Sequence, residues 1–166
     1  MEWSARQAVK YWSPPRRASA LLLLLVGCVP SPAPAVDARG ALELRRAGRA
    51  SEAAGAYEEL LRAEPRNATL WWAYAELLRH DLRRVAAAEA AYARAVEADP
   101  GLAGAHHDYA TLLAQTGRLD DALAEVDAAW SAAPEGSALR AQAERLRTEL
   151  RVRKLDAARG VTSPRE

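Results

Sequence analysis

The sequence has one cysteine, one methionine and no phenylalanine, and only 6% of its residues are aromatic. With Cys28 alone, the chain cannot form a disulfide within itself, so any argument for export must come from other features. β-Branched and aromatic residues, which favour strands, are scarce, whereas alanine and leucine, which favour helices, are abundant. The composition therefore predicts an all-α protein.

An excess of one sign of charge is also lacking, because 23 lysines and arginines stand against 22 aspartates and glutamates. Residues 1–27 hold four of the basic residues and one of the acidic residues, which leaves 19 basic and 21 acidic residues in the remainder, a net charge of −2. Proteins that bind nucleic acid carry a basic patch or stripe. The near-neutral balance argues against nucleic acid as a partner.

Long apolar runs are missing except for one near the N-terminus, where Arg16 and Arg17 precede the leucine run 21–25. The run is roughly ten residues long, short of the about 20 residues that a transmembrane helix needs. A basic segment, a short apolar run and small residues before a cleavage point are typical of a secretory signal. We predict a signal peptide over residues 1–27.

The four residues Leu-Val-Gly-Cys at positions 25–28 resemble the lipobox of bacterial lipoproteins. The resemblance implies that the Cys28 thiol receives a diacylglyceryl group, that the chain is cut before it, and that the new amino terminus is acylated. Several acyl chains on one residue give stable membrane anchoring, which a single chain does not. Residues 28–35 include three prolines and are expected to form a lipid-anchored, semi-rigid linker.

From residue 36 onward the sequence repeats itself. Pro65, Pro100 and Pro134 are spaced 35 and 34 residues apart, and each follows an alanine-rich stretch. Two further sets recur with the same period: Ala41, Ala75 and Ala110 at 34 and then 35 residues, and Ala53, Ala88 and Ala122 at 35 and then 34. Comparison of the sets places one extra residue in the second unit, in the turn 80–83. A period near 34 with two helices per unit resembles the tetratricopeptide repeat.

The resemblance implies a role for each recurring residue. The alanines are small residues where paired helices approach closely, Gly48 and Gly117 suit left-handed turns, and Trp71 is the large residue early in a first helix. After Pro134, Ser137 can cap a final helix that covers the open end of the array. We therefore expect an all-α helix–turn–helix repeat solenoid over residues 36–158, with three repeats and a C-terminal capping helix, followed by a disordered tail, residues 159–166.

Candidate residues for chemistry are few. His106 and His107 are adjacent, so on a helix they point about 100° apart, and neither has a third ligand one turn away. One packing histidine and one surface histidine are a better explanation than a metal site. No phosphate-binding loop, HExxH motif or nucleophile elbow is present. We expect no catalytic residues, no metal and no cofactor, and hence a protein that is not an enzyme.

The resemblance instead implies a peptide-binding groove on the concave face, formed by the first helix of each repeat. The inward positions, carried onto this sequence, are Leu42, Arg45, Arg46, Trp72, Glu76, Arg79, His107, Thr111, Gln115 and Arg145. Aromatic and arginine side chains suit a protein or peptide partner of acidic character. An alternative is that Trp72 only packs against the first repeat. The pattern that clamps a chaperone tail is missing, because Ala38 and Leu42 stand at its positions.

These features favour a membrane-tethered adaptor in the bacterial cell envelope. The chain looks like repeat-bearing lipoproteins that serve as pilus pilotins or outer-membrane assembly factors. We expect a lipid anchor in a membrane facing the periplasm, the outer membrane rather than the inner. Two alternatives stay open: a small periplasmic ligand-binding protein or enzyme subunit, and a soluble, non-lipidated repeat scaffold whose start has been misread.

Overall fold

The computed structural model describes residues 36–160, and these fold into helices joined by short loops. The predicted signal peptide, the whole of the predicted linker and the last six residues of the tail lie outside the described residues. The helices are α1 (Ala38–Arg46), α2 (Ala50–Ala63), α3 (Ala68–Glu76), η1 (Leu77–Asp81), α4 (Val85–Ala98), α5 (Ala103–Gln115), α6 (Leu119–Ala132) and α7 (Ala138–Ala158). No described residue is in a strand. The predicted all-α fold class is confirmed.

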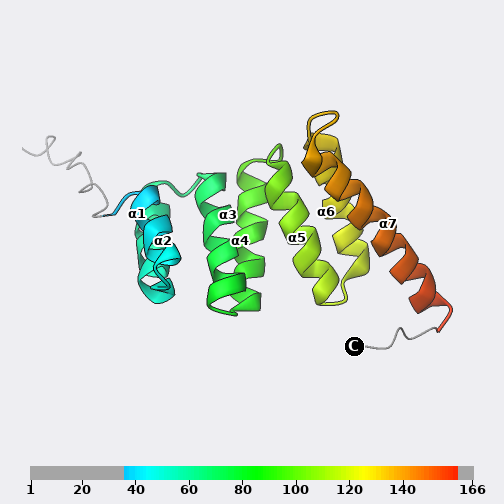
Figure 1. Cartoon of the computed structure of the whole chain (residues 1–166), viewed down its shortest axis with the longest axis horizontal. Coiled ribbons are helices and arrows are strands. Elements are labelled where there is room, and N and C mark those ends of the chain that lie inside the picture. Colours follow the sequence, from blue (N-terminus) through cyan, green and yellow to red (C-terminus); the bar gives the residue numbers. More distant parts are fainter. Residues whose placement is uncertain (1–35, 161–166) are drawn as a thin grey trace, which may run out of the picture. The chain divides into compact units, whose positions relative to one another are not determined.

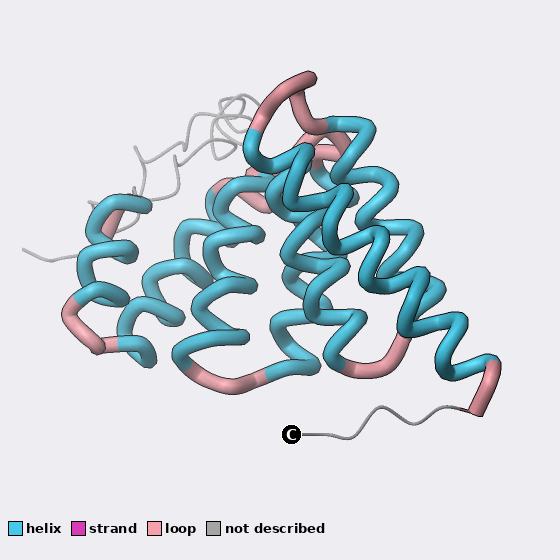
Figure 2. Tube along the Cα trace, turned by 45° about the vertical axis from the view of Figure 1, so that its right-hand side comes forward, coloured by secondary structure: helices cyan, strands magenta, loops and turns pink. Residues whose placement is uncertain are grey.

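Consecutive helices pair as hairpins: α1 with α2, α3 with α4, and α5 with α6. The hairpins follow one another side by side, with α7 packed against α6 after the third (Figures 1 and 2). Each hairpin is one sequence repeat, as predicted. Each repeat therefore presents a first helix and a second helix to its neighbours.

Alanine at the recurring positions lets the helices of a hairpin come close together. Ala41, Ala75 and Ala110 in the first helices have no exposed surface, and the same holds for Ala53, Ala88 and Ala122 in the second helices. A larger side chain at any of these positions would force the helices apart. The recurring alanines therefore form the centre of each repeat.

Polar side chains cap the N-termini of α1, α3 and α7. Asp37 accepts a hydrogen bond from the backbone N–H of Gly40 at 2.7 Å, and Asn67 accepts one from Leu70 at 3.1 Å. The hydroxyl of Ser137 accepts one from the N–H of Arg140 at 3.2 Å, as the sequence predicts for the start of the last helix. These bonds satisfy backbone donors that have no partner within the helix.

The turns between paired helices use a left-handed residue. Gly48 has φ 76° and Gly117 has φ 81°, and in the second repeat Arg83, at the equivalent place, has φ 55°. The extra residue of this repeat is absorbed by the π-helical turn η1, in which the N–H of Leu82 donates to the carbonyl of Leu77. The insertion therefore sits mainly at the end of the first helix rather than in the loop.

The last helix covers the third repeat. Ala143 and Leu150 have no exposed surface, and Leu146 packs half-buried against the same cluster. On the other side of α7, Val152 and Leu155 remain about half exposed, at 51% and 56%. Helix α7 therefore caps the array along one stripe of apolar residues. None of the helices described here has the length and hydropathy needed to cross a membrane.

Candidate protein-interaction surface

The predicted groove residues lie on α1, α3 with η1, α5 and α7. We call them the inner-face residues. Arg79 is buried, and Arg46, Gln115 and Arg145 are exposed. The rest are half-buried: Leu42, Arg45, Trp72, Glu76, His107 and Thr111. Their contacts decide which of them remain available to a partner.

Trp72 reaches from the second repeat to the third. Its indole N–H donates to a carboxylate oxygen of Asp108 in α5 at 2.8 Å. The ring lies so close to Gly104 that the Cβ of any other residue there would sit 2.7 Å from the ring atom Cη2. The sequence offered two explanations for Trp72, a free groove anchor and packing on the first repeat. The indole instead packs on the third repeat and keeps part of its surface exposed.

Asp108 in α5 contacts three of the inner-face residues. Its backbone carbonyl accepts a hydrogen bond from Arg79 Nη1 at 3.2 Å, in addition to the bond that its carboxylate accepts from Trp72. The other carboxylate oxygen lies 3.2 Å from Nδ1 of His107. Sequence reasoning did not select Asp108, because a single aspartate on a helix carries no pattern of its own.

The carboxylate of Glu76 also has partners within the protein. Its carboxylate accepts a short hydrogen bond from the hydroxyl of Tyr92 in α4 and lies 3.6 Å from Nε2 of His80. Burial raises the pKa of Tyr92 far above the usual value of a tyrosine, and the bond to Glu76 raises it further. The Tyr92 hydroxyl therefore stays protonated at neutral pH and keeps Glu76 pointing at its own repeat.

The first repeat contributes two arginines, Arg45 and Arg46, to the inner face. Arg45 donates from Nε to Asp81 at 2.8 Å, across to the π turn of the second repeat. Arg46 is exposed and makes no hydrogen bond or ion pair with the described residues. Arg145 in α7 is exposed and donates to the carbonyl of Ala141, within its own helix. Arg46, Arg79 and Arg145 are therefore the inner-face cations that form no ion pair with a carboxylate of the described residues.

Trp71 and His106, the large residues early in α3 and α5, are not on the inner face. Trp71 is half-buried and donates from its indole N–H to the carbonyl of Pro65 at 2.9 Å. His106 is buried, with Nδ1 2.7 Å from Glu125 and Nε2 3.1 Å from the carbonyl of Pro100. His106 is thus a packing residue, as predicted, and its neighbour His107 faces away from it.

Two tyrosine pairs join successive repeats. The repeat period places Tyr57 and Tyr92 at the same position of the second helices, but sequence reasoning did not include their partners Tyr74 and Tyr109. Tyr57 and Tyr74 have ring centroids 6.2 Å apart, and Tyr92 and Tyr109 are stacked at 6.0 Å. Burial and a hydrogen bond to Glu58 raise the pKa of Tyr74 to about 12. The signal for the missing members was available, since Tyr74 and Tyr109 are separated by one repeat length.

Comparison with solved structures finds the same fold in several protein-binding domains. PcrH in complex with the chaperone-binding region of PopD is 20% identical, with a TM-score of 0.63 over 69% of this chain and 87% of PcrH. The type III secretion translocator chaperone SycD of Yersinia enterocolitica is 15% identical, with a TM-score of 0.63 over 69% of this chain and 81% of SycD. The Sgt2 domain of Aspergillus fumigatus is 16% identical, with a TM-score of 0.65 over 76% of this chain and 82% of that domain. The TM-scores show that these proteins share the fold of this chain.

A comparison with curated protein sequences found no match. Two family models, both described as tetratricopeptide repeat, match residues 39–103 and 79–145. Their overlap, residues 79–103, contains α4, and together they cover the three hairpins and the start of α7. The repeats of residues 39–145 are tetratricopeptide repeats.

Proposed function

We propose that this protein is a lipid-anchored scaffold that holds a protein partner at a membrane of the bacterial cell envelope. The repeat fold supports the scaffold part of the proposal, because solved structures of the same fold include PcrH with a region of PopD and a repeat domain of Sti1 with an Hsp70 peptide. We expect the partner to be an acidic segment of a protein and the activity to be binding without catalysis.

The observation that carries the proposal is the fixed orientation of Trp72. Its indole is held by Asp108 and Gly104 of the next repeat, and part of the ring remains exposed. A side chain that is already ordered loses little conformational entropy when a partner packs against it. Half-exposed aromatic side chains in rigid surroundings are frequent centres of binding energy.

The charges of the inner face support a partner of acidic character. Arg46 has no ion-pair partner among the described residues, and Arg45 is pinned beside it by Asp81. Glu76, the acidic inner-face residue, is turned toward Tyr92. Among the inner-face residues of the first repeat, the charge left without a partner is therefore positive, and opposite charges across an interface speed association.

The anchor rests on residues 25–28 and on the proline-containing linker that follows. Thioether formation needs a thiol, so Cys28→Ser should abolish lipidation without touching the repeats. The linker would place the repeats a short distance from the membrane surface. We favour the outer membrane, with the repeats facing the periplasm.

The experiment is cross-linking in intact cells, followed by separation of membrane and soluble fractions. Tagged parent chain should fractionate with membranes and retrieve a defined protein. Cys28→Ser should move to the soluble fraction and incorporate no fatty-acid analogue. Parent chain that carries no label and stays soluble would contradict the anchor, and recovery of no partner by either chain would contradict the scaffold.

A further inference from the structure

The junction between the first and second repeats differs from the rest of the array. The buried apolar side chains form two clusters, one around α1 and α2 and one running from the second repeat to α7. Trp71, Tyr74 and Leu82 pack against both clusters while remaining half-buried themselves. The junction is therefore closed by side chains that still present surface to solvent.

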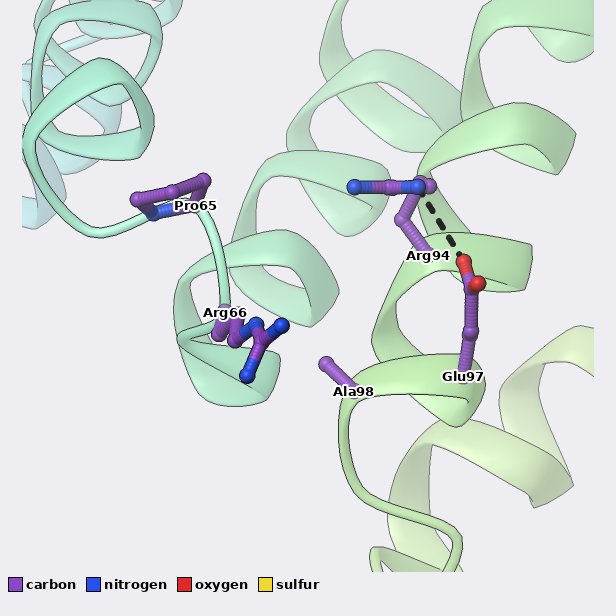
Figure 3. Close-up of a pocket in the computed structure, with 5 residues that line it drawn as sticks. All are labelled: Pro65, Arg66, Arg94, Glu97 and Ala98. Carbon is purple, nitrogen blue, oxygen red and sulfur yellow. Dashed lines mark hydrogen bonds and ion pairs between the residues drawn. The ribbon is translucent and has the colours of Figure 1, made fainter.

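Two hollows lie at this junction. The first has a volume of about 450 Å³ and opens between the loop after α2 and the C-terminal part of α4 (Figure 3). Its lining consists of Pro65, Arg66, Arg94, Glu97 and Ala98. The second has a volume of about 270 Å³ and opens between α2 and α3. Its lining consists of Glu58, Leu61, Arg62, Trp71 and Tyr74.

The indole of Trp71 connects the two hollows. It lines the second hollow, and the guanidinium carbon of Arg94, which lines the first, lies 5.7 Å from the centre of its ring. Trp71 and Trp72 are adjacent on α3, so their side chains point about 100° apart. The two hollows therefore belong to a different surface from the inner face.

The residues that line the two hollows carry a net positive charge, from three arginines and two glutamates. Arg62 and Arg66 make no hydrogen bond or ion pair with the described residues. The two carboxylates of the hollows are already used: Glu58 accepts from the Tyr74 hydroxyl at 2.7 Å, and Glu97 pairs with Arg94 at 3.2 Å. Each hollow thus contains an arginine without an ion pair among the described residues, and Trp71 lines the second hollow and contacts Arg94 of the first.

We propose that this junction is a second docking site, separate from the inner face, for an extended acidic segment of a protein partner. One carboxylate side chain would enter the first hollow between Arg66 and Arg94. A neighbouring apolar side chain would enter the second hollow, against Trp71, with Arg62 at its edge. Two separate hollows of side-chain size fit alternating side chains of an extended peptide, whereas a flat anionic membrane surface cannot enter them.

The test measures fluorescence anisotropy of a labelled octapeptide of alternating glutamate and leucine, titrated with the full chain in detergent. An octapeptide of alternating lysine and leucine is the control for charge. We expect the acidic peptide to bind, and Arg62→Glu and Arg66→Glu each to weaken its affinity about tenfold, because each reverses a charge at the site. Arg151→Glu, on the exposed side of α7 and outside both proposed sites, should leave the affinity unchanged.

Several results would overturn the proposal. These are absence of binding, equal binding of the lysine peptide, and a loss of affinity that is caused by Arg46→Glu but not by Arg62→Glu or Arg66→Glu. Binding of the Cys28→Ser chain, which lacks the proposed lipid anchor, to phosphatidylglycerol vesicles in place of the peptide would assign the arginines to a membrane surface and would also overturn it. All four arginines are on exposed positions, so thermal melting should be unchanged in each variant. The inner-face function does not depend on this site.

Discussion

Trp71 and His106 hold the same position in successive repeats, and each directs a ring nitrogen to the carbonyl oxygen of the proline six residues before it. Those prolines follow the ends of α2 and α4, so their carbonyls have no partner within a helix. Two chemically different rings therefore perform the same task, which is to tie the start of one repeat to the loop that leaves the previous one.

Two substitutions separate the stability that the packing of Trp71 provides from the stability that its hydrogen bond provides. Trp71→Ala should destabilise the fold by about 2 kcal/mol, below the usual range for a buried tryptophan, because the ring is half-buried. Trp71→Phe keeps most of the packing and removes the bond to Pro65, and should cost about 1 kcal/mol. Urea denaturation measures both. Equal losses would show that the hydrogen bond, and not the packing, carries the effect.

Gly104 gives a direct test of how Trp72 is held. In Gly104→Ala the new Cβ would meet Cη2 of the indole at 2.7 Å, so the ring must move and its bond to Asp108 is lost. The strain and the lost bond outweigh the helix preference of alanine, and we expect a net loss of about 1 kcal/mol. Gly55→Ala is the matched control, since nothing lies within 4 Å of the added Cβ. It should stabilise the fold by about 1 kcal/mol. If both variants gain stability equally, Trp72 does not pack on Gly104.

Arg83 holds the left-handed position that glycine occupies in the other two turns. A non-glycine residue there costs about 1–2 kcal/mol, and the entropy of an added glycine in the unfolded chain offsets part of the gain. Arg83→Gly should therefore stabilise the second repeat by about 0.5 kcal/mol. Gly117 has φ 81°, so Gly117→Ala should destabilise the third repeat by about 1 kcal/mol. Thermal melting compares the two, and a loss of stability in Arg83→Gly would mean that the arginine side chain contributes more than its backbone costs.

The cap formed by α7 rests on Leu150 more than on Leu146. Leu150→Ala should cost about 3 kcal/mol, because the side chain is fully buried, whereas Leu146→Ala should cost about 1–2 kcal/mol. Removing residues 137–166 exposes the apolar face of the third repeat that α7 covers and should cause aggregation. Val152→Ala, on the exposed side of the same helix, is the control and should leave the melting temperature unchanged. Unchanged melting of all three shortened or substituted chains would show that α7 is not a cap.

The sequence period was enough to predict the hairpins, the buried alanines, the glycine turns and the last helix, because each of these depends on residues within one repeat. Contacts between repeats could not be predicted in the same way. The direction of Trp72 depends on how far α5 is displaced from α3, and this displacement is set by packing along the whole hairpin. The π turn at 77–81 was visible as one surplus residue, but its place within a helix depends on backbone hydrogen bonds that spacing does not reveal.

The central claim, that the inner face binds a protein partner, is tested most directly by the affinity of the parent chain and of Arg46→Glu for the protein recovered by cross-linking. Arg46 is exposed and unpaired, so its reversal should leave folding intact and act only on a bound partner. We predict that Arg46→Glu weakens the affinity about tenfold, about 1.4 kcal/mol, mainly through slower association at low salt. Arg151→Glu should bind like the parent. Equal affinity of the parent and Arg46→Glu for that partner would contradict the claim.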